Sequence, residues 1–405
     1  MDRDARFEAL SQAAADDREH GLPGRRRLNE GPVGIRPLRL PGGGRTTIMR
    51  VMQTNACSLA CAYCPTFCGG RVRRTSLAPE EVARIFVDAN QAGRADGLFL
   101  TSGVPGRPAR AMDRLLATLD LLRRRHRFGG YVHVKVLPGA QRDQLVEATR
   151  LASRVSVNLE GPTDEVVSAL APDKRLSGDL LPQLELAGRL SQEARLEGRP
   201  WRAAPAGTTT QFVVGAQGES DHALLTLVGR LEGQGLLHHA HFSAFQPVAG
   251  TPMEGVPPTP PIREWRLYQA EHLLRQYGFT SGELPFDAAA NLPLDQDPKT
   301  AWAVAHPERF PLEVMRADYE ALLRVPGIGP RSARRLLEER GRTVLRDGRD
   351  LARLGVDSAR AAWFLTLGGR RLARAPRPEQ LSLFGPGGHL PRVVWKTGVP
   401  PCAYR

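Results

Sequence analysis

A chain of 405 residues, 41% hydrophobic and 24% charged, has the composition of a globular protein with a full-sized core and room for a second domain. The sequence shows no signal peptide, which would need a charged start, an apolar run and a cleavage site, and it contains no run of roughly 18 apolar residues that could span a membrane. We therefore predict a cytoplasmic protein without membrane spans. The net charge of +13 favours a polyanionic partner, with a coding bias toward arginine as the alternative.

Residues 1–45 are polar and basic, become glycine-rich toward their end, and are predicted to be loosely ordered. From residue 46 to 256, strand-like runs alternate with amphipathic runs of helical period. This alternation predicts an α/β fold with a parallel sheet, and about six units predict a partial (β/α)6 barrel of the TIM type. Chemistry in such barrels takes place at the carboxyl ends of the strands. The strands that we expect are 46–53, 97–102, 131–137, 154–159, 208–214 and 239–245.

Four of the five cysteines lie between positions 57 and 68, in a chain that is neither short nor predicted to be secreted. Clustered thiols in such a chain indicate metal ligands rather than a disulfide framework. Cys57, Cys61 and Cys64 have the spacing C-x3-C-x2-C and directly follow the first expected strand. Three thiolates on one loop can hold three irons of a [4Fe–4S] cluster and leave the fourth iron open to a substrate or cosubstrate.

With Tyr63 in its aromatic position, this motif resembles the signature C-x3-C-x-aromatic-C of the radical S-adenosylmethionine (SAM) superfamily. The resemblance implies that the amino acid end of SAM binds the open iron, and that electron transfer yields a 5′-deoxyadenosyl radical. Structural zinc or a redox-inert cluster is the alternative. Cys68 is interpreted as a small loop residue, with a supplementary ligand or a redox-active thiol as alternatives, and Cys402 is uninformative.

Three strand ends resemble the places where the superfamily contacts SAM. The run Thr101-Ser102-Gly103 stands where a glycine-rich segment touches the amino group of SAM. Alternation along the strand at 154–159 puts Ser156, Asn158 and Glu160 on one face, which suits ribose hydroxyls or an amine, although an ordinary capped strand end is the alternative. Gly215 ends a run that resembles the strand with which the superfamily contacts the adenine of SAM. A glycine there permits the backbone to approach the adenine closely.

His133 and Lys135 share one face of the strand expected at 131–137, and valines occupy the other face. If the basic pair faces the barrel lumen, its burial is costly unless it binds an anion or a substrate. If the valines face the lumen, the pair contacts helices or solvent. The two residues are the candidate catalytic groups.

A proline-rich break begins at residue 257, and residues 257–313 form a predicted helical connector. Residues 314–374 show short helical runs joined by glycine-containing turns, which predict a small all-α domain. Its run 322–337 has the pattern P-G-x-G and resembles the helix–hairpin–helix, an element that binds the DNA backbone through turn N–H groups and a helix N-terminus. The residues expected to contact DNA are Gly327, Ile328, Gly329, Arg331, Ser332, Arg334 and Arg335.

Charge supports this interpretation, because residues 316–377 hold 15 arginines against 7 acidic residues. Phosphate contacts of this kind give affinity but little sequence information. The run 354–360 resembles a second, degenerate hairpin. A protein-binding or purely structural hairpin is the alternative.

The tail from 375 to 405 is rich in proline and glycine, and we predict it to be irregular and flexible. Its run Gln380-Leu381-Ser382-Leu383-Phe384 resembles the peptide by which bacterial repair and replication proteins bind the sliding clamp. The alternative is that its apolar side chains anchor the tail on the barrel of the same chain.

Cysteine motif, barrel and hairpin together resemble one family, the radical SAM proteins of DNA modification and repair. The resemblance extends from about residue 46 to 370 and includes the runs 97–103, 241–245, 266–270 and 292–295. It implies an enzyme that modifies or repairs DNA, with an electron donor and a uracil-DNA-glycosylase-like protein as partners. The alternatives are a radical SAM enzyme of structured RNA and a non-catalytic iron–sulfur sensor that binds DNA.

Overall fold

The computed structural model describes residues 2–14, 34–39 and 44–373. They divide into two compact units, one up to Tyr268 and one from Gln269 onward. The division falls within helix α8 (Pro261–Tyr277), shortly after the proline-rich break at which we expected the barrel region to end. Among the described residues, no helix is long and apolar enough to cross a membrane.

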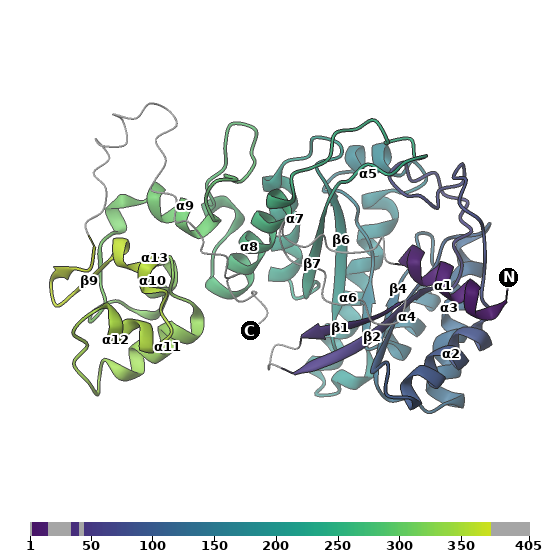
Figure 1. Cartoon of the computed structure of the whole chain (residues 1–405), viewed down its shortest axis with the longest axis horizontal. Coiled ribbons are helices and arrows are strands. Elements are labelled where there is room, and N and C mark those ends of the chain that lie inside the picture. The colour runs from purple at the N-terminus through teal and green to yellow at the C-terminus, as the bar shows by residue number, and fades with distance from the viewer. Residues whose placement is uncertain (1, 15–33, 40–43, 374–405) are drawn as a thin grey trace. The chain divides into compact units, whose positions relative to one another are not determined.

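The first unit is built on one seven-stranded sheet whose strands follow one another in chain order (Figure 1). Strand β1 is antiparallel to β2, and the remaining neighbours are parallel. All six expected strands are confirmed, with ends shifted by a few residues. The strands are β1 (Ile35–Arg39), β2 (Arg45–Met52), β3 (Gly97–Thr101), β4 (Tyr131–Lys135), β5 (Arg154–Ser156), β6 (Thr208–Val214) and β7 (His239–Ala244).

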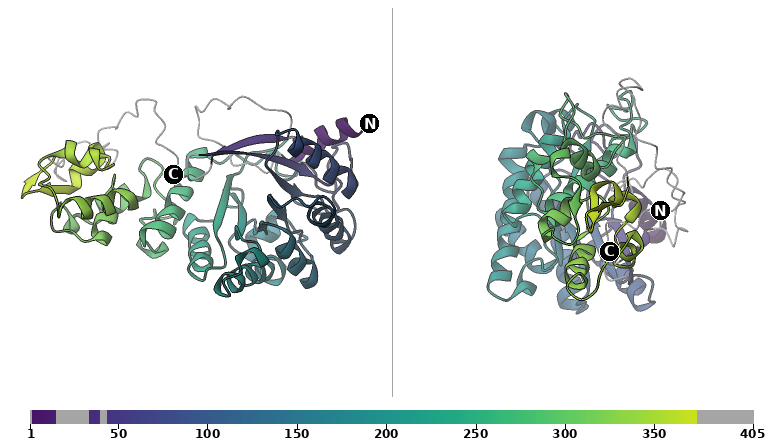
Figure 2. Two further views of the ribbon diagram at one scale, coloured as in Figure 1. Left: turned by 90° about the horizontal axis from the view of Figure 1, so that it is seen from below. Right: turned by 90° about the vertical axis from the view of Figure 1, so that its left-hand side faces the viewer.

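Helices cover the outer face of this sheet, which curls into a half-barrel (Figure 2). The open sheet confirms an α/β fold with an incomplete barrel. Two π-helical turns, Leu121–Arg125 and Leu176–Leu180, adjoin α3 and α6. The helices are α1 (Arg3–Ala13), α2 (Pro79–Gln91), α3 (Pro108–Asp120), α4 (Arg142–Leu151), α5 (Asp164–Leu170), α6 (Leu181–Leu196) and α7 (Asp221–Gly233), with a 3-10 turn at Pro200–Arg202.

The prediction that the chain starts loosely ordered is wrong for two segments, α1 and β1. Asp2 caps α1 by accepting the N–H of Ala5 at 2.7 Å, and the Arg6 guanidinium lies 2.5 Å from the Glu81 carboxylate on α2. Strand β1 pairs with β2 along its whole length, although it contains Pro37. Both elements depend on partners far along the chain, so local composition does not reveal them.

Side-chain alternation along β4 decides which face points into the half-barrel. Val132 and Val134 are fully buried beneath the outer helices, whereas Lys135 lines a cavity on the inner side. His133 lies two residues from Lys135 and therefore shares the inner face. The sequence leaves two orientations of β4 open. In the structure, His133 and Lys135 face the lumen and the valines face the outer helices.

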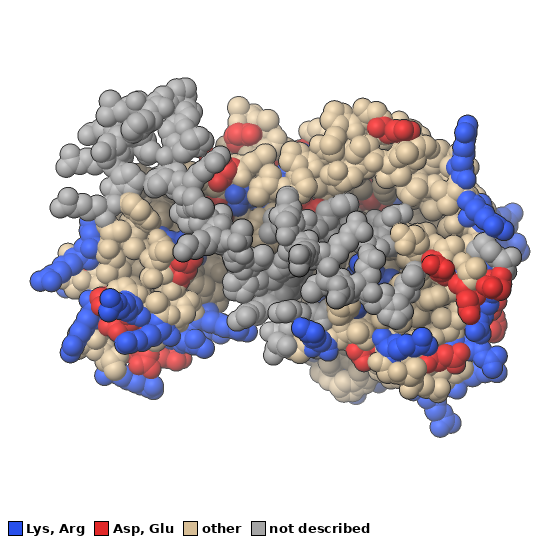
Figure 3. All heavy atoms as spheres, in the orientation of Figure 1, with Lys and Arg blue, Asp and Glu red and all other residues tan. Residues whose placement is uncertain are grey.

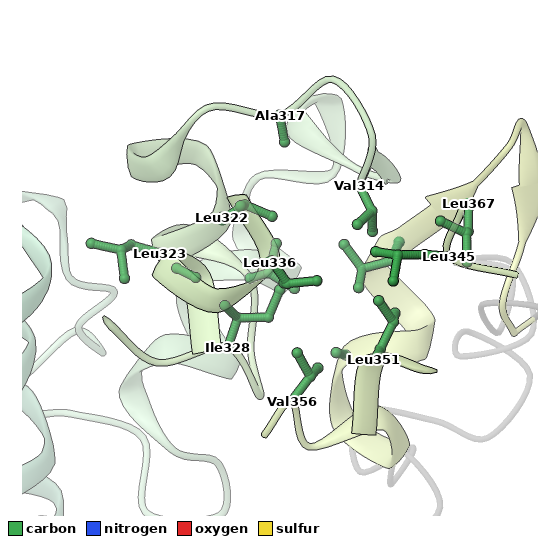
Figure 4. Close-up of a cluster of buried hydrophobic side chains, with 14 residues drawn as sticks. Val314, Ala317, Leu322, Leu323, Ile328, Leu336, Leu345, Leu351, Val356 and Leu367 are labelled. Carbon is green, nitrogen blue, oxygen red and sulfur yellow. The ribbon is translucent and has the colours of Figure 1, made fainter. Parts of the chain in front are cut away.

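The second unit contains short helices around a compact apolar core. Figure 4 shows Leu322, Ile328, Leu336, Leu351 and Val356 pointing toward one another within this core. Beyond α8, the helices are α9 (Pro298–Ala305), α10 (Tyr319–Arg324), α11 (Pro330–Glu339), α12 (Gly348–Arg353) and α13 (Ser358–Ala361), with 3-10 turns at Ser281–Glu283, Pro307–Arg309 and Ala362–Phe364.

The expectation of an all-α domain is wrong, because three very short strands form a sheet here. They are β8 (Leu312–Glu313), β9 (Leu365–Leu367) and β10 (Arg370–Arg371), in the order β10-β9-β8. Gly368 and Gly369, both at positive φ, form the turn between β9 and β10, and their N–H groups donate to the Glu313 carboxylate. Strands of two or three residues are too short to show alternation, so the sequence pattern misses them.

Two helix–turn–helix pairs, α10–α11 and α12–α13, lie together in this unit. Their turns place Gly327 and Gly355 at the same φ of +87°. The N–H of Asp357 donates to the Gly327 carbonyl at 2.9 Å, and the Ser332 hydroxyl donates to the Gly355 carbonyl at 2.8 Å. Each turn is therefore held by a residue of the other pair.

Replacing Gly327 with alanine is expected to loosen both turns. A Cβ at this position would lie 2.6 Å from the Asp357 carbonyl oxygen, and a positive φ costs an L-residue roughly 1–2 kcal/mol. We expect faster hydrogen exchange of the α11 amides, measured by mass spectrometry. Gly341→Ala, whose added Cβ would meet nothing closer than 3.9 Å, is the control and should leave exchange unchanged.

Candidate functional site

The three motif cysteines lie on the loop between β2 and α2, which is fixed by backbone hydrogen bonds. Cys64 N–H donates to the Cys61 carbonyl at 3.1 Å, and Cys68 N–H donates to the Leu59 carbonyl at 2.9 Å. The Ala62 N–H donates to the carbonyl of Leu170 at the end of α5. The loop is thus anchored both to itself and to the neighbouring helix.

Arg74 holds the far side of the same loop. Its guanidinium donates to four backbone carbonyls, at distances between 2.5 and 3.2 Å, which belong to Asn55, Thr66, Phe67 and Gly70. A planar group with five N–H donors suits such a role, which lysine could not fill. The sequence analysis does not single out Arg74, because no spacing rule connects it to the cysteines.

A cavity of about 280 Å³ opens beside this loop, at the carboxyl ends of the strands. Cys57, Cys61 and Cys64 line it together, so the structure brings the three motif cysteines to one place. Other expected site residues that line it are Tyr63, Thr101, Ser102, Gly103, Lys135, Asn158 and Glu160. Lining residues that the sequence analysis misses include Ala14, Lys174, Gln211 and Ser243.

The surroundings of Cys61 and Cys64 favour the protonated form of these two thiols. Burial raises the pKa of Cys61 to about 12, and burial likewise raises the pKa of Cys64. The Cys57 thiol accepts the Val104 N–H at 3.4 Å, and Cys64 lies 3.2 Å from the Thr66 hydroxyl. Thiolates at these positions therefore need a strongly positive partner, such as iron, to offset their burial.

The thiols do not converge on a single point. Within the described part of the chain, no three Cys, His, Asp or Glu side chains are grouped closely enough to hold one metal ion. Thiols spread around the wall of one cavity suit a cluster, in which each iron takes one thiolate. Cys68 is exposed and does not line the cavity, in keeping with its interpretation as a loop residue.

Glu160 and Lys174 form a buried ion pair on the cavity wall. The ammonium nitrogen lies 2.7 Å from one carboxylate oxygen, and the side chains are 8% (Lys174) and 2% (Glu160) exposed. Burial by itself would lower the pKa of Lys174, but the charge of Glu160 raises it above its ordinary value. Glu160 also has a φ of +64°, which costs free energy in a residue other than glycine.

Several buried polar atoms near this pair have no hydrogen-bond partner among the described residues. They include Ser156 Oγ, Asn158 Oδ1 and the second carboxylate oxygen of Glu160. Unsatisfied buried polar atoms are rare in folded proteins unless a water, ion or ligand binds them. Asn158 and Glu160 line the cavity and form a polar wall there, whereas Ser156 does not line it.

Three expected site residues have surroundings other than those predicted. Gly215 does not line the cavity; its N–H donates to the Glu219 carboxylate, and an added Cβ would clash with the Thr259 hydroxyl, so its positive φ serves a closed turn. Gly103 lines the cavity, but an added Cβ would lie 2.3 Å from the Ala56 carbonyl, so this glycine admits the cysteine loop. His133 lies deeper in the lumen, away from the cavity.

The residues expected to bind DNA divide into two groups. Arg331, Arg334 and Arg335 are exposed along α11, and basic side chains stand out on the surface of the second unit (Figure 3). Ile328 is 1% exposed and belongs to the core, so its side chain is not available to DNA. Ser332 is also buried and donates its hydroxyl proton to Gly355. The run Gln380–Phe384 and Cys402 lie outside the described residues.

Comparison with known proteins gives a family match for part of the chain. The model of the Radical SAM superfamily matches residues 51–190, from β2 to α6. The superfamily uses a [4Fe–4S] cluster and SAM, and the spacing of Cys57, Cys61 and Cys64 is consistent with both cofactors. No curated protein sequence matches the chain.

Several solved structures are similar at low identity. HydG, a maturase of the [FeFe]-hydrogenase, is 14% identical, with a TM-score of 0.42 over 56% of this chain and 49% of that chain. Methylornithine synthase (PylB) is 16% identical, with a TM-score of 0.41 over 56% of this chain and 61% of that chain. The radical SAM methyltransferase TsrM from Kitasatospora setae is 17% identical, with a TM-score of 0.37 over 54% and 39% of the two chains. The match covers less than two thirds of each of these relatives.

Proposed function

We propose that this chain, whose residues 51–190 belong to the radical SAM superfamily, is an enzyme that modifies or repairs DNA. The superfamily domain is a radical SAM enzyme: with its cofactors bound, an electron from the reduced cluster cleaves a C–S bond of SAM and yields a 5′-deoxyadenosyl radical.

Different residues of the cavity would bind the cluster and SAM. Cys57, Cys61 and Cys64 would hold three irons, and no fourth thiol among the described residues lines the cavity, so one iron is left for the cosubstrate. The polar wall of Asn158 and Glu160 would orient hydroxyl or amine groups of SAM. The strand ends and the cysteine loop form the wall of the cavity in which the radical would be generated.

The observation that carries the DNA proposal is the exposed set of Arg331, Arg334 and Arg335 beside the Gly327 turn. The N-terminus of α11 leaves backbone N–H groups without intrahelical partners, and the helix dipole attracts negative charge there. The paired turns place a second hairpin, at Gly355, against the first. Such a surface binds a phosphate backbone with little regard to sequence.

Replacing Arg331, Arg334 and Arg335 together with glutamine is expected to weaken duplex-DNA binding. Each lost phosphate contact reduces the slope of log K against log salt by about 0.9, so the slope should fall by roughly 2–3. Fluorescence anisotropy at several salt concentrations measures it. The control variant, Arg84, Arg94 and Arg110 to glutamine, removes the same charge from exposed positions of the first unit. An equal loss in both variants would indicate a general charge effect and contradict the proposal.

Structured RNA is the second candidate substrate, because a hairpin that contacts backbone does not distinguish bases. Duplex RNA and duplex DNA compared at matched salt separate the two candidates. A non-catalytic sensor is separated by an anaerobic assay of 5′-deoxyadenosine, since a sensor need not consume SAM. An electron donor is required for catalysis, whereas binding to the sliding clamp and to a uracil-DNA-glycosylase-like protein stay predictions.

A further inference from the structure

Lys299, on helix α9, lies directly behind the turn that precedes α11. Its ammonium group donates a hydrogen bond to the carbonyl of Ile328, in the middle of the turn 327–329, at 2.5 Å. Lys299 is 7% exposed and Ile328 is 1% exposed, so the two residues meet inside the unit and not at its surface. A helix of the region that the sequence predicts to be a connector therefore contacts the hairpin turn.

The ring of Tyr277, at the end of α8, completes the surroundings of this ammonium group. Lys299 Nζ lies 4.5 Å from the centroid of the ring, which is a cation–π distance. The hydroxyl of the same ring is close to the turn, since a Cβ added to Gly329 would lie 3.3 Å from it. Lys299 and Tyr277 thus support the turn from its inner side.

The charges around Lys299 leave one positive charge without a partner. Arg360 of α13 pairs with Asp297 at 2.6 Å, and Arg324 of α10 pairs with Glu283 at 3.0 Å. Lys299 forms no ion pair with any described residue, and one carbonyl accepts from its ammonium group. Burying an ammonium group is costly unless a negative charge or several acceptors offset the lost hydration.

The titration of Lys299 reflects the same imbalance. Burial lowers its pKa well below the usual range, and the charges of Arg360 and Arg324 lower it further, whereas the charge of Asp297 opposes them. Burial raises the pKa of Tyr277, so that ring is uncharged at neutral pH. A phosphate bound near the turn would favour the charged form of Lys299 and would be attracted by it.

We propose that Lys299 is a positioning residue of the DNA-binding hairpin, which fixes the turn through Ile328 and supplies positive charge behind the backbone N–H groups that face a phosphate. The inference rests on the proposed function, in which the N-terminus of α11 binds the DNA backbone. A buried charge acts through the turn, where salt and water screen it less than they screen a charge on the surface. Helix α9 is thus part of the DNA-binding unit.

The test compares the full chain with Lys299→Gln, which removes the charge but keeps an N–H donor for the Ile328 carbonyl. Fluorescence anisotropy with a DNA duplex gives the dissociation constants. We expect Lys299→Gln to weaken binding about tenfold, and Lys299→Arg, which keeps the charge, to recover most of the loss. The control Arg309→Gln removes the same charge from an exposed position of the same region and should change the constant less than about twofold.

Two further measurements separate the charge of Lys299 from its support of the turn. Hydrogen exchange of the α11 amides should be the same in Lys299→Gln and in the parent chain. The affinity of the parent for DNA should fall as pH rises, at pH values below the ordinary lysine pKa of 10.5, because a neutral amine does not attract phosphate. Lys299→Gln should lack this fall.

Unchanged affinity in folded Lys299→Gln would overturn the inference. So would a loss that Lys299→Arg does not recover and that faster α11 exchange accompanies, because Lys299 would then serve the fold alone. If Lys299→Gln does not fold, the parent decides, and an affinity that does not depend on pH overturns the inference. A parent chain that does not bind duplex DNA refutes the proposed function as well, whereas binding that depends on Arg331, Arg334 and Arg335 but not on Lys299 refutes this inference alone.

Discussion

Cys61→Ala is expected to abolish the formation of 5′-deoxyadenosine from SAM in the reconstituted, reduced protein. Cys61 is the most buried of the three motif thiols and lies between the other two on a loop that its own backbone helps to fix. Alanine would leave one iron of the cluster without a protein ligand and would open the site to solvent. The loss should exceed the roughly 10- to 100-fold that removal of an outer-shell partner costs.

Cys68→Ala is the matched control for this experiment. The two cysteines share one loop, but Cys68 is exposed and outside the cavity. We expect Cys68→Ala to retain iron, visible absorbance and SAM cleavage, and Cys61→Ala to lose all three. Iron and sulfide analysis measures the cluster directly, without relying on turnover. A variant Cys61→Ala that kept both cluster and cleavage would disprove the assignment, and loss in Cys68→Ala would make that residue a fourth ligand.

Sequence patterns predict the parts of this fold that repeat or that have strict spacing. Strands β2 to β7 are visible because apolar runs alternate with amphipathic ones, and the cysteine spacing locates the loop. Alternation on the strand at 154–159 also finds Asn158 and Glu160, which line the cavity. In each case the signal lies within a few residues of the feature itself.

The remaining features depend on contacts between distant residues. Lys174 follows α5 in a short polar loop, and only the fold brings it within 2.7 Å of Glu160. Arg154 has the appearance of an ordinary strand-start residue until the register places it beside His133. Alternation leaves undecided which face of β4 is the inner one, because the choice depends on the helices that cover the valines.

Lys174→Met is expected to lower the free energy of unfolding of the first unit by roughly 3–5 kcal/mol, the usual cost of removing one partner of a buried ion pair. The Glu160 carboxylate would stay buried, with neither oxygen paired to a cation. The pKa of Lys174 is raised above its unfolded value near 10.5, so the stabilising contribution is complete at neutral pH and is lost only as pH rises through the higher folded value. Urea denaturation at pH 7 measures the change.

Two comparisons separate burial from charge in this result. Arg150→Met breaks the exposed ion pair between Arg150 and Glu147, whose side chains are 48% (Arg150) and 33% (Glu147) exposed. This change should lower the free energy of unfolding by less than about 1 kcal/mol.

The double variant Lys174→Met/Glu160→Leu should recover much of the lost stability, because an apolar pair carries no unpaired charge. It should nevertheless bind SAM poorly, since Glu160 supplies part of the polar wall. Recovered stability with normal SAM affinity would show that the pair serves the fold alone, whereas recovered stability with lost affinity would show that the chain keeps a costly buried pair for its ligand.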